Sequence, residues 1–252
     1  MSTKFQVIID IRKNRVVKSG PSEVLELEFL MTNKAYAVSR NHEKFRVPKV
    51  LSFDVSLGIL EMEFIPNISP LKPLLYEKGH LISLLEKTAE AIFIIHEKLV
   101  LEEKETFYLP NMFLDDACLN TAIHGDFTLR NVQYEVNKNI PVFIDWSFCP
   151  KYHVLANFGC KFFDIAFMVN SIFTSPPYSY FFQNKERYRI AIYFIESYFR
   201  LNKSIDEYNK FKKYLQNISR VLYLQSKVES TLSKKFKERK NRIAFIEFAD
   251  SL

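Results

Sequence analysis

The sequence contains 252 residues, of which 48% are hydrophobic and 25% charged, and its formal net charge is +6. These values are ordinary for a soluble globular protein and argue against an extensively disordered chain. The 24 Phe and 13 Tyr residues supply large aromatic side chains for a core. This length suits one compact domain or two closely packed lobes.

The cysteines and the apolar segments indicate in which cellular compartment the protein is expected. Cys118, Cys149 and Cys160 show no C-x-x-C spacing, and their odd number argues against a disulfide framework or a zinc site. Three buried thiols in a reducing compartment are the simplest interpretation. The N-terminus lacks the apolar run of a signal peptide, and charged residues at 96–98 interrupt the most apolar helical stretch. We therefore expect a cytoplasmic protein with no membrane span.

The first quarter of the chain alternates strand and helix signals. Runs of apolar residues bounded by turn residues predict strands, and apolar residues at helical spacing predict a helix. Pro66, Pro70 and Pro73 mark a break after this quarter, so we predict a nucleotide-binding lobe over residues 1–65 and a second lobe over 66–252. The first lobe is predicted to contain strands over 5–11 and 15–18 with a turn at Lys13-Asn14, a helix over 23–36, and paired strands over 47–53 and 58–64.

The rest of the chain is predicted to be mainly helical. A strongly amphipathic helix precedes a short hairpin, whose turn suits the Asn137-Lys138-Asn139 segment. A small antiparallel sheet followed by a larger helical region indicates an α+β fold of two lobes with a cleft between them. The second lobe is predicted to contain a helix over 81–99, hairpin strands over 132–136 and 142–146, and helices over 162–173, 185–201, 204–232 and 236–249.

Three oxygen-bearing side chains around this hairpin suggest phosphoryl transfer. Asp126 and Asn131 lie on the loop before the hairpin, and the hairpin returns Asp145 to the same place. Phosphoryl transfer needs one carboxylate beside the attacking hydroxyl, and a second carboxylate with an amide oxygen to hold Mg²⁺ at the phosphates. Each residue alone has a plainer interpretation, because Asp and Asn commonly cap turns and strand ends. Their joint order and spacing make a kinase the favoured interpretation.

The same stretch resembles the superfamily of aminoglycoside phosphotransferases and choline kinases, which has a protein-kinase-like fold. The resemblance rests on H-G-D-x-x-x-x-N at 124–131, I-D-W at 144–146 and D-x-A at 164–166. The V-P-K-V segment at 47–50 and the E-M-E-F-I-P segment at 61–66 also look like family segments. The central loop is the most specific of these matches.

The resemblance implies a role for each matching residue, with ATP as the phosphoryl donor. Asp126 would be the catalytic base or the group that orients the hydroxyl, and Asn131 and Asp145 would bind Mg²⁺. His124 and Asp164 would support the catalytic loop. The plainer alternatives for these two are an ordinary loop histidine and an acid favoured by a helix start.

The resemblance also implies nucleotide contacts from the first lobe. Lys18, at a strand end before a helix, would contact the phosphates, and a glutamate of that helix would orient it. Glu28 is favoured for this pairing and Glu26 is the alternative, while an exposed strand-end lysine is the plainer interpretation of Lys18. Backbone groups of the hinge segment would bind adenine, namely those of Glu63, Phe64 and Ile65.

One departure from the family lies before Lys18. No glycine precedes it, and the first glycine in the sequence is Gly20. The glycine-rich loop, whose backbone amides approach the phosphates closely, is therefore missing from the predicted first lobe. This keeps a second interpretation open, a pseudokinase that binds a nucleotide or a partner without transfer.

The acceptor is specified only as a small molecule with a hydroxyl group. Segment 147–161 is short and lacks an A-P-E-like end, which argues against a protein acceptor. The positive charge disfavours polycationic aminoglycosides, and no aromatic and acidic enclosure for choline can be identified. A sugar or polyol is preferred, and an acidic or phosphorylated acceptor would suit the charge. Candidate lining residues, whose commoner use is core packing, are Trp146, Phe148, Tyr152, Tyr178 and Tyr180.

Much of the positive charge lies in one segment, Lys234–Arg242. A solvated helix face is the favoured interpretation, and a surface for phosphates, nucleic acid or acidic lipid is the alternative. No nucleic-acid-binding module accompanies this segment, so nucleic acid is not an expected partner. The sequence leaves the oligomeric state and the choice between ATP and GTP open.

Overall fold

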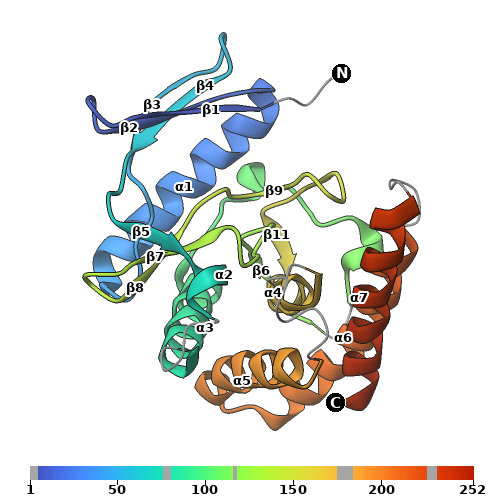
Figure 1. The fold of residues 1–252 in the computed structure, drawn as a ribbon. Coiled ribbons are helices and arrows are strands. Elements are labelled where there is room, and N and C mark those ends of the chain that lie inside the picture. The colour runs from blue at the N-terminus through green and yellow to red at the C-terminus, as the bar shows by residue number, and fades with distance from the viewer. Residues whose placement is uncertain (1–4, 76–80, 116–117, 175–183, 226–231) are drawn as a thin grey trace.

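The computed structural model describes residues 5–75, 81–115, 118–174, 184–225 and 232–252 (Figure 1). It is a mixed α+β arrangement in which an antiparallel sheet is followed by a mainly helical region, as the sequence predicts. The blue N-terminal sheet and the orange and red C-terminal helices lie at opposite ends of Figure 1. Among the helices described, none is long and apolar enough to cross a membrane.

The N-terminal sheet has four strands: β1 (Gln6–Asp10), β2 (Arg15–Ser19), β3 (Val50–Asp54) and β4 (Ile59–Glu63). They are antiparallel and lie in the order β1-β2-β4-β3. Helix α1 (Ser22–His42) runs beyond its predicted end at residue 36 and packs on this sheet. The small cluster buried between them consists of Leu25, Val50, Leu60 and Met62.

Left-handed residues close the turns of this sheet. Asn14 has φ 51° at the end of the predicted β1–β2 turn, a conformation that asparagine tolerates. Gly58 has φ +59°, and a Cβ atom there would lie 2.3 Å from the Gly20 carbonyl oxygen. Glycine is therefore required in the β3–β4 turn, because a side chain would collide with the backbone.

A second sheet connects the two parts of the chain. Strands β5 (Ile68–Pro70), β7 (Val132–Glu135) and β8 (Ile140–Phe143) are antiparallel in the order β5-β7-β8. A parallel bridge between Arg46 and Val142 joins the segment after α1 to β8. The predicted strand over 142–146 in fact begins at Ile140 and ends before Asp145, which frees that residue for the site described below.

Two short ladders flank this sheet, and one of them carries a disulfide. Strands β6 (Asn120–Ala122) and β11 (Phe158–Cys160) pair antiparallel, and Cys118 is bonded to Cys160. The prediction of three free thiols is therefore wrong, and its argument for a reducing compartment is lost; Cys149 remains a free buried thiol. The partners are 42 residues apart and meet through strand register, which cysteine spacing does not reveal. The other ladder pairs β9 (Phe148–Cys149) with β10 (Val154–Leu155).

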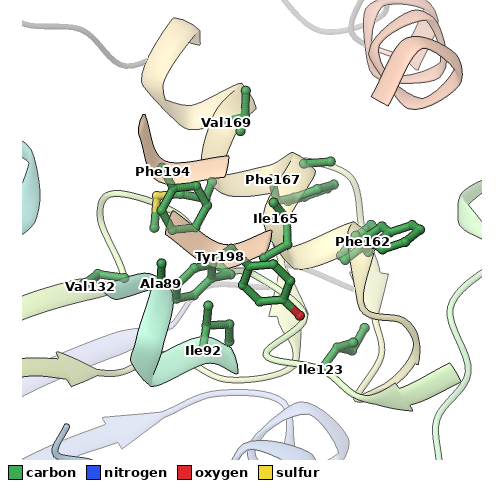
Figure 2. Close-up of a cluster of buried hydrophobic side chains, with 14 of the residues drawn as sticks. Ala89, Ile92, Ile123, Val132, Phe162, Ile165, Phe167, Val169, Phe194 and Tyr198 are labelled. Atoms are coloured by element: carbon green, nitrogen blue, oxygen red, sulfur yellow. The ribbon is translucent and has the colours of Figure 1, made fainter. Parts of the chain in front are cut away.

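Helix α4 (Phe162–Thr174) lies at the centre of the helical region, and every residue from 162 to 173 is buried. Figure 2 shows Phe194 and Tyr198 in the same buried cluster as Ile165 of α4 and Ile92. A helix that is apolar on all sides must be surrounded by other elements, and α4 is therefore a rigid base for the residues it carries. The remaining helices are α2 (Leu71–Leu74), α3 (Leu81–Lys98), α5 (Asn184–Asn202), α6 (Ile205–Gln225), α7 (Leu232–Ser251), and the 3₁₀ turns η1 (Glu103–Glu105) and η2 (Asn111–Phe113).

These helices match the predicted ones with small shifts at their ends. The predicted helix over 204–232 corresponds to α6, which is described to Gln225, while residues 226–231 lie outside the described part. The predicted helix over 236–249 is longer at both ends and forms α7.

Candidate active site

The loop between β6 and β7 is fixed by one buried carboxylate. Gly125 has φ +82°, and a Cβ atom there would lie 2.4 Å from a backbone oxygen, so only glycine fits. Asp164, near the start of α4, accepts hydrogen bonds from the backbone N–H groups of His124 (2.6 Å) and Gly125 (3.1 Å). The same carboxylate bonds to Nε2 of His96 on α3 at 3.0 Å. Helices α3 and α4 thereby hold the loop in place.

The His124 side chain lies beneath this loop as a neutral packing group. It is fully buried, and its ring stacks on that of Trp146 with centroids 4.3 Å apart. Burial lowers the pKa of His124 to about 4, against the opposing influence of the Asp164 and Asp145 carboxylates. The imidazole is therefore uncharged at neutral pH and contributes to the shape of the site rather than to its charge.

Asp126 and Asn131 contact each other within the loop. The Nδ2 atom of Asn131 donates to the Asp126 carbonyl oxygen at 2.9 Å and to Oδ2 of its carboxylate at 2.7 Å. Burial raises the pKa of Asp126 to about 6, and hydrogen bonds from Cys149 and Asn131 oppose that rise. Because both amide hydrogens of Asn131 are used, its Oδ1 atom is left to accept or to coordinate.

Asp145 and Lys18 join the two parts of the chain. Asp145 follows β8 in a left-handed conformation with φ 60°, which is costly for a residue other than glycine and is typical of functional sites. Its Oδ1 accepts from Nζ of Lys18, which also donates to Oε1 of Glu28 at 2.5 Å. Burial alone would lower the pKa of Lys18, but these two carboxylates raise it above its usual value. Lys18 therefore pairs with Glu28, while Glu26 is exposed.

One cavity of about 750 Å³, which is within the usual range for small-molecule sites, is lined by Lys18, Glu28, Asp126, Asn131 and Asp145. Asp126, Asn131 and Asp145 therefore share one opening, as their sequence spacing predicts. Phe5 and Phe148 also line it, and the centroids of their rings are 5.7 Å apart. The lining also includes Trp146 and Tyr152, whereas Tyr178 and Tyr180 lie outside the described residues.

The predicted hinge residues Glu63, Phe64 and Ile65 are not part of that lining. The Glu63 amide donates to the Lys49 carbonyl oxygen at 2.8 Å, and the Phe64 amide donates to that of Asn14 at 3.1 Å. The Glu63 carboxylate pairs with Arg46. Both amides are thus used within the protein and are not free for a ligand.

Among the lining residues that the sequence analysis missed, Cys149 and Arg242 bear most on the chemistry of the site. Cys149 lies against the Asp126 carboxylate and donates to it. Arg242 belongs to the basic segment interpreted as a solvated face, yet it is only 5% exposed and lines the cavity. The solvated interpretation is therefore wrong for Arg242, because the position of α7 against α4 and α6 turns this residue inward. A cationic residue placed among apolar ones at Ile243, Ala244 and Phe245 was the available signal.

Comparisons with known proteins show the fold. No protein-family model matches the chain, and no curated protein matches it by sequence. Its structure is similar to that of a choline/ethanolamine kinase family protein from Mesorhizobium loti, with a TM-score of 0.61 and 10% identity over 94% of this chain and 86% of that one. A choline kinase from Streptococcus pneumoniae aligns with a TM-score of 0.55 and 13% identity over 99% and 94% of the two chains.

A third similar structure is an amicoumacin kinase in complex with AMP-PNP and Ca²⁺. It aligns with a TM-score of 0.59 and 11% identity over 99% of this chain and 86% of that one. The chain thus has the kinase-like fold seen in choline kinases and aminoglycoside phosphotransferases, as the resemblance predicted. At these identities the likeness shows the fold and leaves the activity to be argued from the site.

Proposed function

We propose that this protein is an ATP- and Mg²⁺-dependent phosphotransferase that moves the γ-phosphate to a hydroxyl group of a small molecule. The observation that supports this best is the convergence of Lys18, Asp126, Asn131 and Asp145 on one cavity. These residues come from β2, the loop before β7 and the segment after β8, and phosphoryl transfer needs such a set of charges. The kinase-like fold supports the same proposal.

In this proposal Lys18 contacts the nucleotide phosphates. A lysine used in this way must be held in place, and its ion pair with Glu28 does so. Residues 1–65 would form the nucleotide-binding lobe, with residues 66–252 carrying the catalytic loop and the acceptor site. Because the Glu63 and Phe64 amides are already used, any contact of Glu63–Ile65 with adenine would involve other backbone groups.

The residues present fit a magnesium ion held together with a nucleotide. The amide oxygen of Asn131 has no hydrogen bond among the described residues, and the Asp145 side chain is 42% exposed, so an oxygen of each is available. No group of three or more His, Cys, Asp or Glu side chains in the described chain could hold a metal alone. Mg²⁺ is commonly bound by one or two protein oxygens with substrate phosphates and water. When bound there, it would neutralise charge that develops on the phosphates.

Asp126 is the proposed catalytic base. Its pKa of about 6 keeps most of the carboxylate ionised at neutral pH while leaving it basic enough to take a proton. The acceptor oxygen forms a bond to the γ-phosphorus, and the bond from that phosphorus to the β–γ bridging oxygen breaks. ADP leaves with the electron pair of that bond, and the hydroxyl proton passes to Asp126. Positioning and charge neutralisation supply most of the rate enhancement in such reactions.

A pseudokinase is the second candidate, and one observation favours it. The connection between β1 and β2 contains no glycine, so its backbone cannot approach phosphates as closely as a glycine-rich loop does. Such a protein would bind a nucleotide through Lys18 and Asp145 without transferring phosphate. The complete set of Asp126, Asn131 and Asp145 supports transfer more strongly.

The test is calorimetric titration of the full chain with ATP, with and without Mg²⁺. We expect Asp145→Ala to weaken Mg²⁺-dependent binding by about tenfold or more, since that corresponds to roughly 1.4 kcal/mol of lost interaction. Asp206→Ala, which alters an exposed carboxylate paired with Lys210, is the matched control and should bind normally. Failure of the unaltered protein to bind ATP with Mg²⁺ would refute the proposal. Binding of ATP without label transfer from γ-³²P-ATP to any polyol, sugar acid or sugar phosphate would instead favour the pseudokinase.

A further inference from the structure

The side of the cavity formed by α7 contains a buried cation without a described counter-charge. Arg242 is 5% exposed, and its Nη1 atom donates to the Leu222 carbonyl oxygen at 2.7 Å. A guanidinium group has five N–H donors and stays charged at any pH of interest. Within the described ranges no carboxylate forms an ion pair with it. A buried charge is costly unless it is paired, so this one is suited to meet an anion.

One neighbour of Arg242, Tyr152, has a buried hydroxyl. The Tyr152 hydroxyl is buried and has no hydrogen-bond partner in the described residues, although Arg242 and Asn170 lie beside it. The Tyr152 ring is held edge-on against Phe167 with centroids 5.5 Å apart, so the hydroxyl is fixed in position. A guanidinium, a phenol and an amide on one cavity wall form a group of donors, which is what an oxyanion binds.

This group lines the same cavity as the proposed catalytic base. Cys149 connects them, because its thiol contacts the Asp126 carboxylate and its carbonyl oxygen accepts from the Tyr152 amide at 3.3 Å. Asp126, Tyr152 and Arg242 all line the same cavity. One small molecule can therefore present a hydroxyl to Asp126 and an anionic group to Arg242.

We propose that the acceptor carries an oxyanion, either a carboxylate or a phosphate ester, which Arg242 binds together with the Tyr152 hydroxyl. This substrate class rests on the phosphotransferase function proposed above. Among the described lining residues the carboxylates are Glu28, Asp126 and Asp145, and none of them pairs with Arg242. A cationic acceptor would place like charges together, and a neutral one would leave Arg242 buried and unpaired.

The first test measures binding of inorganic phosphate to the full chain by isothermal titration calorimetry. We expect Arg242→Gln to weaken phosphate binding by about 10–100-fold, the usual loss when a charge-assisted contact is removed. Arg220→Gln, which alters an exposed arginine paired with Asp250, is the control and should bind as the unaltered protein does. Lys18→Met tests whether phosphate binds instead at the nucleotide end of the cavity, where Lys18 contacts Glu28 and Asp145.

Three outcomes of this test would overturn the proposal. In the first, the unaltered protein does not bind phosphate at millimolar concentration. In the second, Arg242→Gln binds phosphate as tightly as the unaltered protein does. In the third, Lys18→Met abolishes phosphate binding and Arg242→Gln does not. To separate loss of binding from loss of folding, Arg242→Lys is measured in parallel with Arg242→Gln, together with thermal melting of each variant. The lysine variant keeps the charge and should retain part of the affinity, which a purely structural role for Arg242 would not produce.

The second test measures turnover with matched acceptors. Glycerol is compared with glycerate and glycerol 3-phosphate, and glucose with gluconate and glucose 6-phosphate, with choline as the cation. We expect the anionic members to have the higher kcat/KM, and the carboxylate and phosphate arms show which oxyanion is preferred. Preference for a neutral or cationic member would refute the inference. If no member is turned over, the phosphate titration alone decides, and failure of Mg²⁺-dependent ATP binding would refute only the proposed function.

Discussion

The two ends of the cavity hold their buried charges in different ways. At the nucleotide end, Lys18 contacts both Glu28 and Asp145, so that its charge is compensated within the protein. At the other end, Arg242 is 5% exposed and donates to a backbone oxygen, with the neutral Tyr152 hydroxyl beside it and no ion pair to a described carboxylate. Asp126 lies between these ends on the shared cavity.

This difference indicates what each end is built to bind. A triphosphate with its magnesium ion brings both signs of charge, so the end that receives it needs both a cation and carboxylates. An end with a lone cation and donor groups is complementary to an anion alone. Under the proposed function, the distribution of paired and unpaired charge would therefore distinguish the donor end from the acceptor end.

The largest expected effect lies between the two ends, at Asp126. Asp126→Asn keeps the size and the contact with Asn131 but removes the base, so turnover should fall about 10²- to 10⁴-fold. Binding of ATP with Mg²⁺ should stay within about threefold of the original, because Lys18 and Asp145 are unchanged. The measurements are steady-state kinetics and calorimetry, with Asp206→Asn as the control. Turnover within tenfold of the original would exclude Asp126 as the base.

A smaller effect is expected at the nucleotide end, where the helix offers a matched pair of glutamates. Glu28→Gln removes the buried carboxylate that holds Lys18, and we expect kcat/KM for ATP to fall about 10–100-fold, as is usual for a charge-assisted hydrogen bond. Glu26→Gln alters an exposed residue two positions away and should change kcat/KM for ATP less than twofold. Equal effects of the two substitutions would contradict the assigned pairing.

The proposed nucleotide end forms from two local groups, and within each group the parts are close together in the chain and were predictable from sequence. Asp126 and Asn131 share one loop, and a short hairpin returns Asp145 to it. Lys18 and Glu28 are ten positions apart across a strand-to-helix connection, which leaves few choices of partner. Short separations limit the possible arrangements, and in such cases local pattern determines geometry.

The acceptor end was not predictable, because packing between distant elements creates it. Arg242 reaches the cavity only through the position of α7 against α4 and α6. The disulfide between Cys118 and Cys160 likewise depends on the register of β6 and β11, which spacing along the chain does not encode. The hydrogen bond from the Glu63 amide to the Lys49 carbonyl oxygen also results from strand pairing and is not encoded by a motif.

The smallest expected effect compares two buried tyrosines in the absence of ligand. The Tyr152 hydroxyl has no partner among the described residues, whereas that of Tyr214 donates to the Phe113 carbonyl oxygen at 3.0 Å. Tyr152→Phe removes an unsatisfied polar group and should raise the free energy of unfolding by about 1 kcal/mol, while Tyr214→Phe should lower it by a similar amount. Urea titration of both variants measures the change in the free energy of unfolding and shows whether it is positive for Tyr152→Phe and negative for Tyr214→Phe. Destabilisation by Tyr152→Phe would mean that its hydroxyl is already satisfied, and the acceptor end would then lose one of the donors that distinguish it from the nucleotide end.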